Sequence, residues 1–219
     1  MNIQYYGDYC FKLTTKPSGR ATEDVVVVTD LPKKETGLRA PQGEAHVVLL
    51  SHEDPATPAL ALLRGSPVVL STPGEYAVKG MATLGFPSYQ DEKEGSLRGQ
   101  NTIFLFEVEE MTVCYLGALG HEPNDEIIEK MNSVDILFVP VGGQDTLPVN
   151  RIDELIRKIE PKVVIPMHYK LSGMTTELPD IKEFCKLIGN CPKEVLSKWN
   201  VKAKELEGKT REVVILDKN

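Results

Sequence analysis

The amino-acid sequence predicts an α/β protein in which a β-rich first half precedes strands that alternate with helices. In the first half, short β-branched and aromatic runs are separated by Gly, Pro and Asp, which is typical of strands and tight turns. From Glu122 onward, apolar runs of strand length alternate with segments of helical periodicity, the pattern of a sheet covered by helices. A third observation is a continuous apolar run at 47–50, which predicts a fully buried strand that ends directly in polar residues.

The β-rich half contains two expected hairpins. Segments 3–6 and 10–14 flank a Gly-Asp turn, and segments 101–108 and 111–116 flank Glu109-Glu110. Further strands are expected at 24–30, 47–50, 67–70, 72–80 and 81–86, with a short helix at 59–64. Residues 33–44 and 87–100 are polar and contain glycine, so we expect exposed loops there.

In the second half, helices are expected at 123–131, 149–159 and 180–188, and strands at 135–143, 161–169 and 211–216. The apolar stripe of 149–159 is typical of a helix that packs on the core. The chain has 219 residues and no internal repeat, so we expect one domain that spans 1–219.

The composition, with 41% hydrophobic and 26% charged residues, is that of an ordinary globular protein. The net charge of −7 argues against a nucleic-acid partner, and an anionic small substrate would need a local basic pocket. No stretch is long and apolar enough to cross a membrane, and the first residues lack the pattern of a signal peptide. We therefore expect a cytoplasmic protein that does not associate with membranes.

The four cysteines are widely spaced and form no Cys-x-x-Cys motif. In a cytoplasmic chain such cysteines are usually small buried hydrophobes. We therefore expect Cys10, Cys114, Cys185 and Cys191 to form neither a disulfide nor a zinc site.

The strand at 47–50 runs into Ser51-His52-Glu53-Asp54. Loops at strand ends commonly carry sites because the strand fixes the position of the side chains that follow it. His52 and Asp54 are two residues apart, close enough to converge on one ion if the loop curls. The alternative is a histidine and an acid in a solvated turn.

Several motifs carry a resemblance to a known family. Ser-His-Glu-Asp-Pro-Ala-Thr at 51–57 resembles the Ser-His-x-His-x-Asp-His loop of the metallo-β-lactamase fold, in the branch of L-ascorbate-6-phosphate lactonase-like, zinc-dependent hydrolases. Gly-Asp-Tyr-Cys-Phe at 7–11, Pro-Gly-Glu-Tyr at 73–76 and Pro-Met-His-Tyr at 166–169 are similar to other motifs of that branch. The resemblance implies a four-layer αββα sandwich of the metallo-β-lactamase type.

The resemblance also implies which residues stand at the family's metal-ligand positions. His52 and His168 match ligand histidines, and Asp54 stands where a second histidine would be. Four positions hold other residues: Ala56, Thr57, Gln90 and Ala118, the last in place of a bridging aspartate. Asp8 replaces the histidine of the family's Gly-His-Ser-Cys-Phe motif. We predict a metal site, if there is one, at His52, Asp54 and His168, with His121 as a neighbour.

Two hypotheses for function follow. The first is a degenerate member, a pseudoenzyme without the dinuclear metal site that binds a small molecule or a protein partner and needs no cofactor. The alternative is a mononuclear hydrolase of a lactone or phosphate ester, with one zinc, manganese or iron ion. The sequence assigns no catalytic residue and leaves open whether the chain forms a homo-oligomer.

Overall fold

The protein is described by a computed structural model that covers residues 1–18, 23–52 and 58–219. Within these ranges the strands form a six-stranded sheet, a seven-stranded sheet and a small pair, β4 (Gly43–Glu44) with β6 (Leu63–Arg64). The six-stranded sheet has the order β14 (Trp199–Asn200), β1 (Asn2–Gly7), β2 (Cys10–Thr15), β3 (Val25–Thr29), β5 (Val47–Leu49) and β7 (Val68–Leu70). The opening hairpin and the buried strand before His52 are thereby confirmed.

The seven-stranded sheet is antiparallel at one side and parallel at the other. Its order is β15 (Glu212–Val213), β13 (Val163–Met167), β12 (Ile136–Pro140), β11 (Met111–Tyr115), β10 (Gln100–Val108), β9 (Met81–Tyr89) and β8 (Gly74–Val78). Glu109 and Glu110 both have positive φ, the conformation that a two-residue hairpin turn requires. The pairs from β11 to β15 are parallel, so the chain must cross over between them, and helices make those crossovers.

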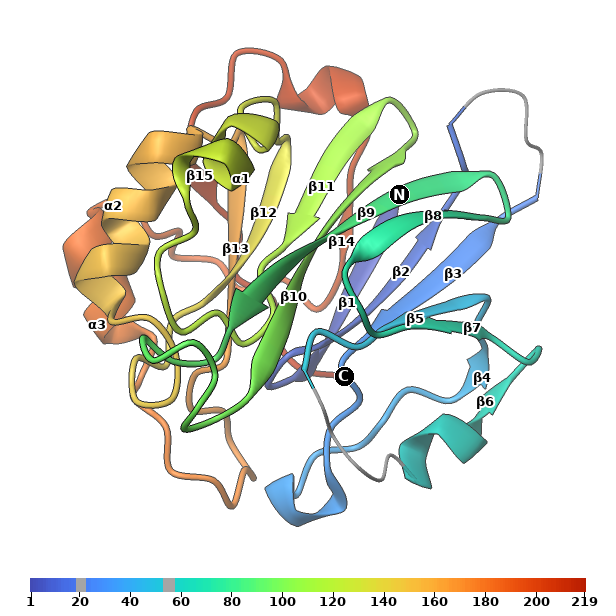
Figure 1. The fold of residues 1–219 in the computed structure, drawn as a ribbon, viewed down its shortest axis with the longest axis horizontal. Coiled ribbons are helices and arrows are strands. Elements are labelled where there is room, and N and C mark those ends of the chain that lie inside the picture. The colour runs from blue at the N-terminus through green and yellow to red at the C-terminus, as the bar shows by residue number, and fades with distance from the viewer. Residues whose placement is uncertain (19–22, 53–57) are drawn as a thin grey trace.

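Three α-helices cover the outer face of the seven-stranded sheet (Figure 1). They are α1 (Asp125–Lys130), α2 (Val149–Ile159) and α3 (Lys182–Ile188). The Asn124 side chain caps α1 by accepting a hydrogen bond from the Ile127 N–H. Helix α2 buries Ile152, Leu155 and Ile156, as its apolar stripe predicts. No helix in the described ranges is both long and apolar enough to span a membrane.

The main core lies between the two sheets. The Phe11 ring from the first sheet contacts the Phe138 ring from the second, with centroids 4.7 Å apart and the planes at 63°. On its outer face the six-stranded sheet buries a second cluster that includes Val26, Val28 and Val48. This cluster is covered by the 3-10 helix η2 (Pro58–Leu62) and the β4–β6 pair. The α/β sandwich is confirmed, and the short helix expected at 59–64 is a 3-10 helix, η2.

Strands β9 and β10 are longer than the sequence suggests, so the expected loop 87–100 shortens to 90–99. The Asp91 carboxylate accepts four backbone hydrogen bonds within this loop, from the N–H groups of Lys93, Gly95, Leu97 and Arg98. Burial alone would raise the pKa of Asp91, but these hydrogen bonds outweigh it and lower the pKa. The loop is therefore organised around one ionised side chain.

Two further 3-10 helices lie in segments where no helix was expected. The segment 33–44 contains the 3-10 helix η1 (Lys34–Thr36), and η3 (Ala203–Leu206) precedes β15. The prediction for the cysteines was wrong at two positions, because Cys185 and Cys191 form a disulfide with a Cα–Cα distance of 5.2 Å. Gly189 ends α3 in the left-handed conformation and turns the chain back, which brings these cysteines together. Cys10 and Cys114 are free and buried, as expected.

We predict that Leu137→Ala lowers the free energy of unfolding by about 2–5 kcal/mol, the range for truncating a buried leucine. Leu137 is the second residue of β12 and is 0% exposed. Leu97→Ala is the control, because the Leu97 side chain is 66% exposed. Denaturant unfolding checks both variants, and equal losses would contradict the assignment of β12 to the core.

We also predict that Asp91→Ala destabilises the protein in a pH-dependent way. A lowered pKa adds stability above the ordinary aspartate pKa of about 4, and this stability is lost as the pH falls through the lowered pKa. The difference in unfolding free energy between wild type and variant should therefore be largest at neutral pH and become smaller in acid. Glu129→Ala, which removes an exposed acid from α1, serves as the control. A difference that is constant with pH would contradict the assignment.

Candidate functional site

The two histidines of the predicted site follow strands of different sheets. Each of these strands is parallel to its neighbours in its own sheet. His52 follows β5, and His168 follows β13 directly in the left-handed conformation, with φ of 56°. A non-glycine residue adopts that conformation only when its surroundings impose it. Here the His168 N–H donates to the Asp8 carbonyl oxygen at 2.9 Å, so the turn between β1 and β2 fixes the strained residue.

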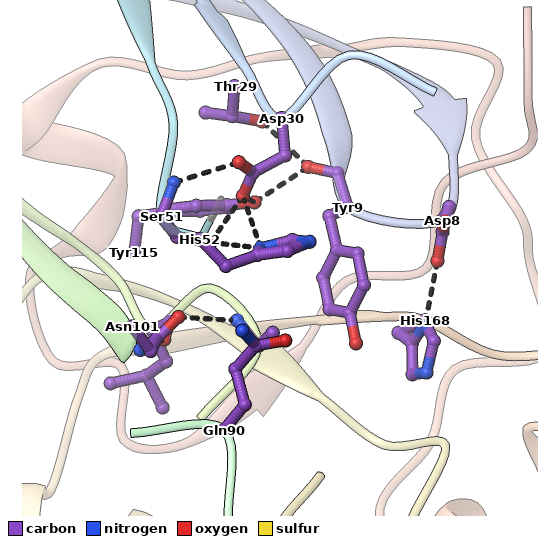
Figure 2. A network of polar contacts seen from close by, with 12 residues as sticks. Asp8, Tyr9, Thr29, Asp30, Ser51, His52, Gln90, Asn101, Tyr115 and His168 are labelled. Atoms are coloured by element: carbon purple, nitrogen blue, oxygen red, sulfur yellow. Dashed lines mark hydrogen bonds and ion pairs between the residues drawn. The ribbon is translucent and has the colours of Figure 1, made fainter. Parts of the chain in front are cut away.

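Tyr9, from that same turn, lies between the two histidines (Figure 2). Its ring stacks on His168 with centroids 4.3 Å apart and an interplanar angle of 14°. Its other neighbour is His52, 5.3 Å away at 69°. The two imidazoles cannot be further apart than the sum of these separations, so the structure brings them together around one aromatic ring. Burial raises the pKa of Tyr9 well above its ordinary value, so the ring is a neutral phenol.

A carboxylate holds His168 in place. The His168 Nδ1 atom lies 2.6 Å from Asp8 Oδ1, and the carboxylate must accept the proton in this contact. This leaves the Nε2 atom with a lone pair when the ring is neutral. Nε2 is buried and has no hydrogen-bond partner among the described residues. A carboxylate on one ring nitrogen and a free second nitrogen is the usual arrangement of a metal-binding histidine.

His52 is held in a similar way through Ser51 and Asp30. The Ser51 hydroxyl donates to Asp30 Oδ2 at 2.6 Å, and His52 Nδ1 lies 2.9 Å from the same hydroxyl. Because that hydroxyl gives its proton to the carboxylate, it accepts from Nδ1–H, and the free lone pair of a neutral His52 is on Nε2. Both histidines are therefore oriented through Nδ1.

Asp30 is the buried acid of this network. It also accepts hydrogen bonds from the Ser51 backbone N–H at 2.8 Å and from the Tyr115 hydroxyl at 2.6 Å. Burial raises the pKa of Asp30, while the neighbouring His52 and these hydrogen bonds counteract part of that effect. Its oxygens are occupied by protein donors, so Asp30 positions Ser51 and His52.

Asp8, Tyr9, Asp30 and His52 line a small cavity of about 30 Å³. That volume is enough for a water molecule or a bare cation, since one water needs about 10–15 Å³ on this measure. Of the two histidines, His52 is in the lining of this cavity.

The remaining predicted residues fall into two groups. Asp54, Ala56 and Thr57 lie outside the described residues. His121 is described, and both of its ring nitrogens contact backbone: Nε2 accepts from the Tyr89 N–H at 3.1 Å, and Nδ1 lies 2.9 Å from the Glu122 carbonyl oxygen. His121 therefore has no nitrogen available to a metal in this structure.

Two other ligand positions, Gln90 and Ala118, make hydrogen bonds within the protein. The Gln90 amide donates to the carbonyl oxygens of Arg98 and Gln100. Ala118 is buried, and its N–H donates to Asn101 Oδ1 at 2.9 Å. The Ala118 turn depends on Gly117, where an added Cβ would collide with the Ser51 side chain. Gly120 is equally constrained, because a Cβ there would overlap the Gln90 backbone.

Sequence reasoning missed four residues of this site: Tyr9, Asp30, Asn101 and Tyr115. The acid at the end of the strand 24–30 was visible, but nothing in the local pattern says that its carboxylate turns inward. Asn101 is 1% exposed and bonds to Ser88 and Leu116 as well as Ala118. A single asparagine at the start of a strand gives no sign of such a role.

The two histidines fit a metal ion in their chemistry, because each offers an oriented imidazole nitrogen. A stable site needs three or four ligands. Across 1–18, 23–52 and 58–219 no cluster of three or more His, Cys, Asp or Glu side chains could hold an ion. The described part of the chain thus supplies two donors.

Comparison with known proteins gives consistent results. The family model described as "Beta-lactamase superfamily domain" matches residues 2–168. A UPF0173 metal-dependent hydrolase of Bacillus mycoides is 25% identical over 225 residues, covering 90% of this chain and 96% of that protein. A relative from Bacillus cereus with the same description shows the same identity and coverage.

Solved structures agree. A candidate Zn-dependent hydrolase of the metallo-beta-lactamase superfamily from Thermotoga maritima has 29% identity and a TM-score of 0.75, covering 99% of this chain and 98% of that one. A metallo hydrolase of Ignicoccus hospitalis, at 14% identity and a TM-score of 0.60, covers 100% of this chain and 95% of its own and shares the fold.

We predict that Tyr9→Ser strengthens binding of zinc or cobalt by roughly three- to tenfold, since an aromatic pair contributes about 0.5–1.5 kcal/mol that an ion between the histidines would disrupt. Tyr76→Ser is the control, because Tyr76 lies on β8 and bonds only to Thr72 among the described residues. Isothermal titration calorimetry on folded protein measures the affinity. Unchanged or weaker binding in Tyr9→Ser would show that the ring does not obstruct the site.

Proposed function

This chain belongs to the family of the beta-lactamase superfamily domain, and we propose that it is a metal-dependent hydrolase that uses a single, weakly held metal ion. The relatives support a requirement for a metal ion, because the Bacillus proteins are described as metal-dependent hydrolases. The sequence alone favoured a pseudoenzyme without metal. The relatives, which align along almost the whole chain, favour the alternative.

The observation that carries the proposal is the Nε2 atom of His168. Leaving a buried nitrogen acceptor without a partner costs about 1–3 kcal/mol, so such an atom in a folded protein calls for an explanation. A metal ion would supply the missing partner. The Asp8 contact at Nδ1 supports this explanation, because it fixes the tautomer that coordination requires.

Each residue of the site has a distinct role in the proposal. His52 and His168 are the ligands, and Asp54, which lies outside the described residues, is the candidate for the third. Asp8 orients His168, and Asp30 orients His52 through Ser51. A bound ion would act as a Lewis acid on the substrate and lower the pKa of a water. Asp8 accepts the Nδ1 proton of His168 and the Ser51 hydroxyl accepts that of His52, so both rings are fixed in orientation.

The proposed substrate is a small anionic ester, either a lactone or a phosphate ester. This class follows from the resemblance to the lactonase-like branch. The same proposal includes one domain over 1–219, no nucleic-acid or membrane partner and a cytoplasmic location. The disulfide between Cys185 and Cys191 weighs against that location, because disulfides are rare in the reducing cytoplasm.

A second candidate function, a binding module without metal, is favoured by one observation. Tyr9 fills the space between the imidazoles and stacks closely on His168. If the ring never moves, an ion cannot contact both histidines. The two candidates differ in one measurable property, which is whether His52 and His168 bind metal at all.

Metal titration tests the proposal. Protein purified without added metal should hold well under one equivalent, and added zinc should bind with a stoichiometry of one. His168→Gln and His52→Gln should abolish this binding, because each removes an imidazole ligand. His121→Gln should retain it, because both nitrogens of His121 contact backbone.

Elemental analysis after dialysis and calorimetry with zinc give the readouts, and thermal unfolding shows that each variant is folded. The absence of saturable zinc binding, or binding that survives loss of either His52 or His168, would overturn the proposal in favour of the binding module. Two equivalents of zinc that survive dialysis would contradict a mononuclear site.

A further inference from the structure

We propose that a second, larger cavity, which shares Lys33 with the small cavity beside His52, binds a small amphipathic anion, a carboxylate or phosphate on an apolar body. The cavity has a volume of about 690 Å³ and lies between the segment 32–42 and the 3-10 helix η2. We call it the basic pocket. Its volume is within the range of about 300–1,000 Å³ that is typical of small-molecule sites.

Apolar side chains form most of the walls. They come from both sides of the pocket: Tyr6 and Leu38 on one side, Ala59 and Leu62 on the other. Leu62 is 46% exposed, a high value for a large aliphatic side chain. Burying that surface under a ligand would be favourable at about 25 cal/mol per Å². The walls therefore fit the hydrocarbon part of a ligand.

Three cations lie along the rim in a protein whose net charge is negative. The net charge of the chain is −7, yet the segment from Lys33 to Gln42 contains three cations and one acid. All three cations, Lys33, Lys34 and Arg39, line the pocket, and Lys34 and Arg39 are exposed. Within the described residues, neither Lys34 nor Arg39 has a carboxylate within ion-pair distance. An anionic group would complete the rim, and an arginine can hold a carboxylate or phosphate with two hydrogen bonds.

The pocket is continuous in sequence with the candidate site. Asp30 and Leu31 line the small cavity beside His52, Pro32 lines the basic pocket, and Lys33 contributes to both. A ligand held by its anionic group at the rim could place its far end towards His52. This role as a substrate pocket rests on the proposed function, whereas the binding itself requires no metal.

Binding of octanoate tests the inference, with octylammonium as the matched cation and inorganic phosphate as the anion without an apolar body. Calorimetry on chelator-treated protein should show saturable octanoate binding, weaker binding of phosphate and none of octylammonium. Raising the ionic strength should weaken octanoate binding, because the rim is exposed to solvent.

Arg39→Gln and Lys34→Gln should each weaken octanoate binding by about two- to fivefold, the range for an exposed charge pair. Lys198→Gln is the matched control, because it removes an exposed lysine outside the pocket. Leu62→Ser should also weaken octanoate binding, whereas phosphate binding should stay unchanged. Octyl phosphate in place of octanoate separates a preference for phosphate from a preference for carboxylate.

The outcomes separate this inference from the proposed function. Octanoate binding that is unchanged in His168→Gln supports an independent pocket, whether or not zinc binds. Equal binding of octanoate and octylammonium, or no saturable binding of either alkyl anion, overturns the inference even if zinc binds as proposed. Equal losses in Arg39→Gln and Lys198→Gln would show only a general charge effect and would also overturn it.

Discussion

The packing of Tyr9 between His52 and His168 is the constraint on which the rest of the site depends. It joins three segments that are far apart in the sequence: the first hairpin turn, the end of β5 and the end of β13. The Asp8 contacts with His168 strengthen the same junction, since they fix both the backbone and the ring of a residue in a strained conformation. The two sheets are thus tied together where the chemistry is proposed.

This constraint explains how the chain can retain the family fold while the ligand positions change. The framing elements are β5 and β13, each buried along its whole length, and their stability comes from apolar contacts between the sheets. Asp30 and Asp8 then orient the imidazoles by hydrogen bonds that do not depend on a metal. A site of this kind is preorganised.

The sequence predicts the fold well because its signals are local. β-branched runs, the Glu109-Glu110 turn and the stripe of α2 each specify an element from neighbouring residues, and the structure contains all three. The site was harder to predict, since the packing of Tyr9 and the inward orientation of Asp30 are set by contacts between residues far apart in the chain. The disulfide was missed for a similar reason: its formation depends on the left-handed Gly189 that follows α3.

The central claim is that His52 and His168 bind one metal ion through Nε2, and NMR of the imidazole nitrogens during zinc titration tests it most directly. The claim predicts that Nε2 of both histidines shifts on zinc binding, that both Nδ1 atoms keep their protons, and that the His121 signals stay unchanged. Unchanged His52 and His168 signals at saturating zinc, or a shift confined to His121, would contradict it.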